Sequence, residues 1–118
     1  MKKLYASALL MVIMISSQAQ IVINEFQPDN DRIEIKNLGN QTVNVGSYFL
    51  CSFPLYTQIS SMTVVSGSTM LMPGQLLVVT GHAMAQADDE LGLYTLPQYT
   101  NSAAMIDYVE WGFSGHTR

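Results

Sequence analysis

The chain has 118 residues, which is enough for one domain; 48% of them are hydrophobic and only 12% are charged. After residue 19 it carries nine acidic side chains against three basic ones. This balance excludes the cationic patch that nucleic-acid affinity depends on, so direct nucleic-acid binding is not expected.

The N-terminus has the three-part layout of a secretory signal peptide. A basic start, Met1 to Lys3, precedes the apolar run from Leu4 to Ile15, and the small residues from Ser16 to Ala19 follow. The apolar run is shorter than the roughly 20 residues that span a bilayer, so a retained N-terminal membrane anchor is the less favoured alternative. We therefore predict a signal peptide over residues 1–19 and a secreted domain over residues 20–118. This domain would be extracellular, periplasmic or at the cell surface, without a membrane span after cleavage.

The rest of the chain reads as short strands separated by Gly, Pro, Asn and Ser turns. Strands are expected over residues 21–26, 32–37, 42–45, 47–53, 62–65, 69–72, 75–80, 91–96 and 105–111. Residues 81–90 are expected to form a loop or a single helical turn. Because the connections are too short for crossover helices, the pattern predicts an all-β, mainly antiparallel sandwich or barrel.

The single cysteine, Cys51, excludes an internal disulfide. It lies in an aromatic-rich run with no adjacent histidine, so we expect a buried, small, apolar side chain rather than a reactive thiol.

Two glutamates on the first predicted hairpin raise the question of acid–base catalysis. Glu34 alternates with Arg32 and Lys36 on a face expected to be solvated, whereas Glu25 is expected to share a face with Ile21 and Ile23. Arg32 is expected to pair with Glu25 across the hairpin. Exposed carboxylates beside cations make poor general acids, so no catalytic residues are predicted.

Two acidic loops offer oxygen ligands to a cation. The calcium candidates are Asp29, Asp31, Asp88, Asp89 and Glu90. Extracellular modules bind Ca²⁺ weakly through such loops, but neither run has the spacing of a complete calcium loop. Acidic turns also form because Asp and Asn cap their own backbone, so the metal assignment is none, with these residues kept as weak candidates. His82 and His116 have no partner at ligand spacing for zinc.

Five motifs occur in a characteristic order. They are Ile21-Val22-Ile23-Asn24-Glu25-Phe26, Ile33-Glu34-Ile35-Lys36-Asn37, Gly46-Ser47-Tyr48-Phe49-Leu50, Leu71-Met72-Pro73-Gly74 with the apolar strand after it, and the pair Leu91-Gly92-Leu93-Tyr94 and Ile106-Asp107-Tyr108-Val109. This order resembles the lamin tail domain, as found in bacterial secreted proteins. The third motif departs from the family, since Gly-Ser-Tyr stands where Gly-Trp is often seen.

The resemblance implies an immunoglobulin-like antiparallel β-sandwich that acts as a binding or scaffold module and not as an enzyme. The leading hypothesis is a non-catalytic secreted module for attachment or protein interaction, without a cofactor. Its partner would be a protein or, through a platform of exposed aromatic side chains, a surface polysaccharide. The alternative is an N-terminal accessory domain of a larger secreted hydrolase or nuclease. The sequence stops at Arg118, just after a strand, so the chain is expected to be either a fragment of a longer secreted protein or a domain that lacks its final strand. In the second case, an open sheet edge would favour an edge-strand homodimer.

Overall fold

The computed structural model describes residues 20–113 and 115–116, so the predicted signal peptide at residues 1–19 lies outside the described part. The elements are β1 (Ile21–Gln27), β2 (Arg32–Asn37), β3 (Val43–Asn44), β4 (Phe49–Ser52), β5 (Leu55–Gln58), a 3₁₀ turn η1 (Ile59–Ser61), β6 (Thr63–Ser66), β7 (Met70–Leu71), β8 (Leu76–Thr80), β9 (Asp89–Tyr94) and β10 (Met105–Trp111).

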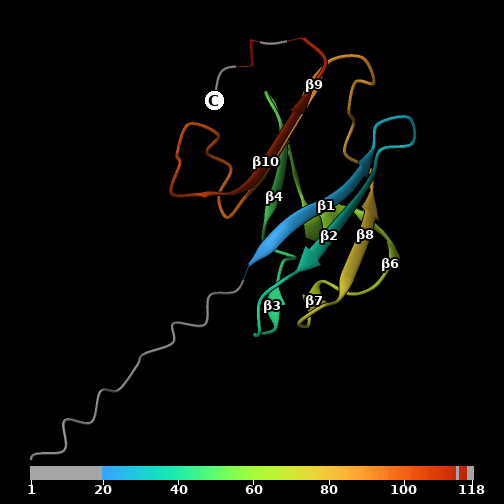
Figure 1. The fold of residues 1–118 in the computed structure, drawn as a ribbon, viewed down its shortest axis with the longest axis vertical. Coiled ribbons are helices and arrows are strands. Elements are labelled where there is room, and N and C mark those ends of the chain that lie inside the picture. Colours follow the sequence, from blue (N-terminus) through green and yellow to red (C-terminus); the bar gives the residue numbers. More distant parts are fainter. Residues whose placement is uncertain (1–19, 114, 117–118) are drawn as a thin grey trace, which may run out of the picture.

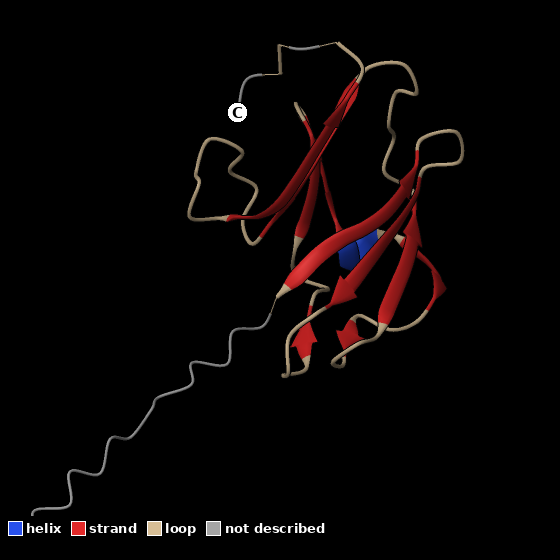
Figure 2. Cartoon of the chain, viewed as in Figure 1, coloured by secondary structure: helices blue, strands red, loops and turns tan. Residues whose placement is uncertain are grey.

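The strands form two antiparallel four-stranded sheets and a small ribbon. The first sheet has the order β1-β2-β8-β6, the second has the order β10-β9-β4-β5, and β3 pairs with β7. Figure 1 shows the sheets as two layers, and Figure 2 shows that strands make up almost all of the regular structure. The predicted all-β, immunoglobulin-like antiparallel sandwich is confirmed.

The main difference from the predicted elements lies between residues 54 and 61. No strand was predicted there from the sequence. In the structure, β5 forms a tight hairpin with β4, and the turn contains a cis Phe53–Pro54 peptide bond. Residues 81–88 form a loop without a helical turn, and β9 starts at Asp89 instead of Leu91. Within the described residues, no helix is long and apolar enough to cross a membrane.

The alternation of β2 explains how the first sheet faces the core. Ile33 and Ile35 are fully buried, and they lie opposite Val79 and Leu77 of β8, which are buried as well. The side chains between them point to the other face of the sheet. One face of β2 and β8 therefore supplies apolar side chains to the interior.

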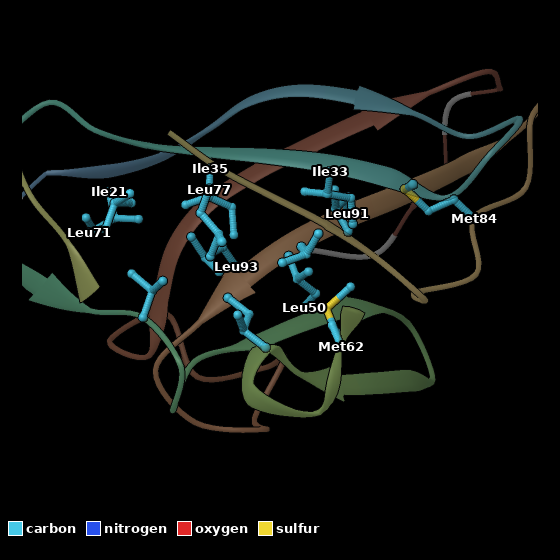
Figure 3. Close-up of a cluster of buried hydrophobic side chains, with 13 residues drawn as sticks. Ile21, Ile33, Ile35, Leu50, Met62, Leu71, Leu77, Met84, Leu91 and Leu93 are labelled. Carbon is cyan, nitrogen blue, oxygen red and sulfur yellow. The ribbon is translucent and has the colours of Figure 1, made fainter. Parts of the chain in front are cut away.

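The core is built from both sheets. Figure 3 shows Ile33, Ile35 and Leu77 of the first sheet packed against Leu91, Leu93 and Leu50 of the second. Burying an aliphatic side chain of this size contributes about 1.5 to 3 kcal/mol. The contact between the sheets is thus the main source of stability.

The edge strands β1 and β10 lie beside each other and close one side of the sandwich. The backbone N–H of Ile23 donates to Asp107 Oδ2 at 2.7 Å, and Phe26 stacks on Trp111 with ring centroids 4.7 Å apart. A hydrogen bond and a ring pair therefore join the first and last strands of the fold. We call this contact the β1/β10 seam.

The outer face of the second sheet is covered by the loop at residues 95–104. Cys51 and Tyr94 are fully buried and pack with Ala104, while Tyr56 and Tyr99 cover the edge of this cluster. The N–H of Tyr99 donates to the Tyr56 hydroxyl at 2.8 Å, which fixes the loop on the sheet. The predicted burial of Cys51 is confirmed.

Candidate functional site

Glu25 and Glu34 lie directly opposite each other on the outer face of the first sheet. A bulge puts them there, because the extra residue Asn24 shifts the alternation of β1 by one position. The prediction that Glu25 shares a face with Ile21 and Ile23 is therefore wrong. The sequence did carry a sign of the bulge, because the apolar residues of β1 change from odd positions, Ile21 and Ile23, to an even one, Phe26.

The predicted pairing between Glu25 and Arg32 is also not formed. Arg32 lies opposite Gln27, and no ion pair joins it to Glu25 in the part of the chain that the structure describes. Glu25 instead accepts a hydrogen bond from Gln27 Nε2 at 3.4 Å, and Glu34 accepts one from the Asn24 side-chain amide. Neutral amides hold both carboxylates.

The two glutamates line an open hollow of about 210 Å³ on this outer face. Its lining residues are Glu25, Phe26, Gln27, Arg32, Glu34 and Val78. Ligand pockets usually enclose about 300 to 1,000 Å³, and a glycosidase must surround a sugar ring between its two carboxyl groups. The hollow is too small and too open for that task.

In the first acidic loop, the carboxylate of Asp31 makes a structural contact. Asp31 has a positive φ of 53°, and its Oδ1 accepts the N–H of Met84 at 3.0 Å. This bond ties the β1–β2 turn to the loop that follows β8. The neighbouring Asp29 lies in the same turn.

The second acidic loop organises the C-terminal segment in the same way. Asp88 Oδ1 accepts the N–H of Phe113 and a bond from His116 Nε2, both at 3.0 Å, while Asp89 Oδ2 accepts the N–H of Ala85 at 2.8 Å. Among the described residues, no group of three or more His, Cys, Asp or Glu side chains is arranged to hold a metal. The structure therefore does not bring the two calcium-candidate loops together as one ligand set.

Glu90, the last calcium candidate, is buried under the β4–β5 turn. Its Oε1 accepts the N–H of Phe53 at 3.3 Å, and its Oε2 accepts the hydroxyl of Tyr108 at 2.7 Å. Burial and the hydrogen bonds to Glu90 and Glu110 raise the pKa of Tyr108 well above its usual range. The phenol thus keeps its proton and serves as a donor to the buried carboxylate.

The side chains that most resemble a catalytic pair are Ser52 and His82, which the sequence did not indicate as a pair. His82 is fully buried between the sheets, with Nε2 at 2.9 Å from Ser52 Oγ and Nδ1 at 2.8 Å from Thr57 Oγ1. A serine within hydrogen-bond distance of a histidine nitrogen is the arrangement of a nucleophile and its base. We call Ser52, Thr57 and His82 the buried histidine cluster.

The direction of the hydrogen bonds argues against nucleophilic catalysis by this cluster. Ser52 Oγ donates to the carbonyl of Glu90 at 2.7 Å, so His82 Nε2–H must donate to Ser52 Oγ, and Nδ1 accepts from Thr57. Burial lowers the pKa of His82, although the nearby carboxylates of Asp89 and Asp31 oppose this. Because Nε2 already carries the hydrogen that it donates to Ser52, this nitrogen cannot take the proton of the buried serine, and the lowered pKa makes the ring a weaker base.

The aromatic side chains mostly support the fold. Phe53 packs against Tyr99 with ring centroids 4.1 Å apart, and Trp111 Nε1 donates to the carbonyl of Ala85 at 2.9 Å. Phe53 remains 49% exposed. In the described part of the chain, two exposed phenylalanine rings remain for the predicted aromatic platform: Phe53 beside the β4–β5 turn, and Phe113, which is 77% exposed, in the C-terminal segment.

Comparison with known proteins gives a likeness in fold. No family model matches the chain, and no curated protein matches it. A solved structure of the archaellum periplasmic stator protein FlaG from Sulfolobus acidocaldarius matches with a TM-score of 0.50 and 13% identity, covering 80% of this chain and 100% of that one. A chain from the complex of FlaF and FlaG of the same organism gives a TM-score of 0.48 at 13% identity, covering 80% of this chain and 90% of that one. At this level of identity, the FlaG likeness supports the β-sandwich fold alone.

Proposed function

We propose that this chain is a non-catalytic secreted module that attaches to a protein partner, of the lamin tail domain type. Two features support the family assignment: the five ordered motifs across residues 21–112 and the two-sheet antiparallel sandwich that they form. The signal-like segment at residues 1–19 supports secretion. FlaG carries a comparable fold and is described as a periplasmic stator protein, which suggests a similar role outside the cytoplasm for this chain.

One observation carries the non-catalytic assignment. The side chains that most resemble a nucleophile and its base, Ser52 and His82, are buried and hydrogen-bonded in the direction opposite to the one catalysis requires. Glu25 and Glu34 are side by side but line only a small open hollow. The chemistry-bearing groups therefore stabilise the sandwich, and its outer surface is left for binding.

Binding to intact cells of the source organism tests the attachment role. The purified protein is titrated onto these cells before and after the cells are treated with protease or with periodate. Saturable binding that protease abolishes and periodate spares is the expected result. A Leu50→Asp variant, which places a charge in the core, is the control for binding that requires the folded sandwich.

Turnover assays test the non-catalytic assignment. The protein is incubated with protein, polysaccharide, ester and phosphodiester substrates, beside a variant carrying Glu25→Gln and Glu34→Gln. No product above background is expected from either protein. Product release by the wild type that the double variant lacks would refute the proposal, and binding lost only after periodate would assign a polysaccharide partner.

A further inference from the structure

The charged residues of the chain are confined to two stretches. Between Lys36 and Asp88 the sequence contains no Asp, Glu, Lys or Arg. This interval holds β3 to β8, so the charges of the described residues lie on β1, β2, β9, β10 and their adjoining loops. Both strands of the β1/β10 seam, which lie side by side in Figure 1, carry acidic residues: Glu25 on β1, and Asp107 and Glu110 on β10. The edges β5 and β6 have no charged side chain.

Exposed apolar side chains gather in the same uncharged interval. Those that it contains are Leu38, Phe53, Leu55, Val64, Val65, Met70, Met72 and Leu76. Phe53 and Leu55 flank the β4–β5 turn, and Leu55 is 43% exposed at the start of β5. Natural sheets protect their edges with charges, above all Lys, and this side of the sandwich has none.

The four edge strands differ in how their ladders are built. β1, β10 and β6 each carry a register shift, at Ile23/Glu25, Met105/Asp107 and Val64/Ser66. Such bulges bend an edge and disfavour the addition of another strand. The β4–β5 ladder runs from Phe49↔Gln58 to Ser52↔Leu55 without a shift. Among the edge strands that the structure describes in the two sheets, β5 is therefore the one without a register shift, and it lies at the opposite edge of the second sheet from β10.

We propose that β5 pairs antiparallel with β5 of a second copy of the chain, which joins the two second sheets into one continuous sheet. The inference rests on the proposed binding role, and it names a partner and a surface for it. A two-fold axis would bring the same patch of each copy together, with Leu55 and Phe53 near the contact. Main-chain hydrogen bonds would supply affinity, as in other cases of strand addition.

The distribution of charged residues favours a second copy of the chain as the partner that pairs with β5. Two acidic chains repel each other wherever their carboxylates meet, and beyond about 8 Å this repulsion is largely screened at physiological salt. Pairing through β5 keeps the acidic strands β1, β2, β9 and β10 away from the contact and brings uncharged residues together. A basic partner would instead bind the acidic side of the sandwich.

The test measures the average molecular mass of the protein in solution as a function of its concentration, for the wild type and two matched variants. Leu55→Lys and Val64→Lys add the same charge at residues that are 43% and 44% exposed, the first on β5 and the second on β6. Sedimentation equilibrium of the purified wild type should show a rise from one chain to two with increasing concentration. Leu55→Lys should raise the dimer dissociation constant by roughly tenfold or more, because each copy would place a lysine in an uncharged contact, and Val64→Lys should leave it within about twofold.

A mixture of Leu55→Lys and Leu55→Glu copies should recover the dimer. Hydrogen exchange gives a readout without any substitution, since the amides of β5 should be better protected at high than at low concentration. A wild type that stays monomeric, equal effects of the two lysine variants, or a larger effect at Val64 would each overturn the proposal. A monomer that still binds protease-sensitive sites on cells would overturn this inference and leave the proposed function standing.

Discussion

Removing the hydroxyl of Ser52 should destabilise the protein far more than removing an equivalent hydroxyl at the surface. Ser52 Oγ donates to the Glu90 carbonyl at 2.7 Å and accepts from His82 Nε2, inside the buried histidine cluster. Ser61 Oγ also donates to a backbone carbonyl, that of Gln58, at 2.7 Å, but in solvent. Ser52→Ala and Ser61→Ala therefore delete the same kind of bond in two environments.

The expected magnitude follows from the environment. Ser52→Ala loses a hydrogen bond worth about 1 kcal/mol net and leaves the His82 N–H facing no acceptor in the interior, which costs about 1 to 3 kcal/mol more. The sum is about 2 to 4 kcal/mol. For a domain of this size, each kcal/mol lowers the melting temperature by roughly 4 to 8 °C, so a fall of about 8 to 30 °C is expected. Ser61→Ala should cost no more than about 0.5 kcal/mol, because water replaces the lost partner.

Urea unfolding followed by circular dichroism measures both variants, with the free energy of unfolding obtained by linear extrapolation. The slope against urea should match the wild type, which shows that the same surface is exposed on unfolding. Equal losses for Ser52→Ala and Ser61→Ala would refute the reasoning. They would mean that the buried histidine cluster is open to water.

Three further predictions concern protonation, surface charge and a turn. In an NMR titration, His82 should have a pKa below 6.5 because it is buried, while His116 should lie above 6.5 because the hydrogen bond and charge of its carboxylate partner outweigh its desolvation. The contribution of His82 to stability is then complete above pH 6.5 and falls as the pH drops towards its folded-state pKa. The contribution of His116 is complete below pH 6.5 and is lost as the pH rises through its folded-state pKa. A His82 pKa above that of His116 would contradict the structure. Glu25→Gln should raise the free energy of unfolding by about 0.2 to 1 kcal/mol at low salt, since it removes one of two like charges that face each other across the strands. A lower free energy of unfolding in urea would show instead that the carboxylate stabilises the fold. Gly67→Ala should lower the melting temperature clearly more than Gly74→Ala. Both glycines have positive φ, which strains an alanine by about 1 to 2 kcal/mol, but of the two only Gly67 would place the new Cβ 2.2 Å from a backbone oxygen. Equal melting temperatures of the two variants would contradict the turn geometry.

The sequence was enough to predict the sandwich because most strands alternate or end at Gly and Pro. It could not place β5, since Leu55 to Gln58 is short, follows a proline and carries no alternation of its own. That strand exists because it pairs with β4, which is a tertiary effect. Pairing also explains why the strand beginning at Leu91 was expected two residues too late, as Asp89 joins the ladder opposite Trp111.

The candidate site was harder to predict than the fold. The sequence indicated that Glu25 and Glu34 are near each other, but a single bulge at Asn24 decided which face Glu25 occupies. The buried histidine cluster joins residues 30 and 25 positions apart, so no local motif could reveal it. A histidine two residues after a strand, in a segment without charged residues, was the one available signal.

The β1/β10 seam has a consequence for the order of folding. The bond from Ile23 to Asp107 spans 84 residues, whereas the β9–β10 hairpin joins neighbouring segments. Closing a long loop costs more entropy than closing a short one, so the seam should form after that hairpin. In refolding with pulsed hydrogen exchange, the amide of Ile23 should therefore become protected later than those of Leu91 to Leu93. Simultaneous protection would show instead that the two ends of the chain meet in the first step.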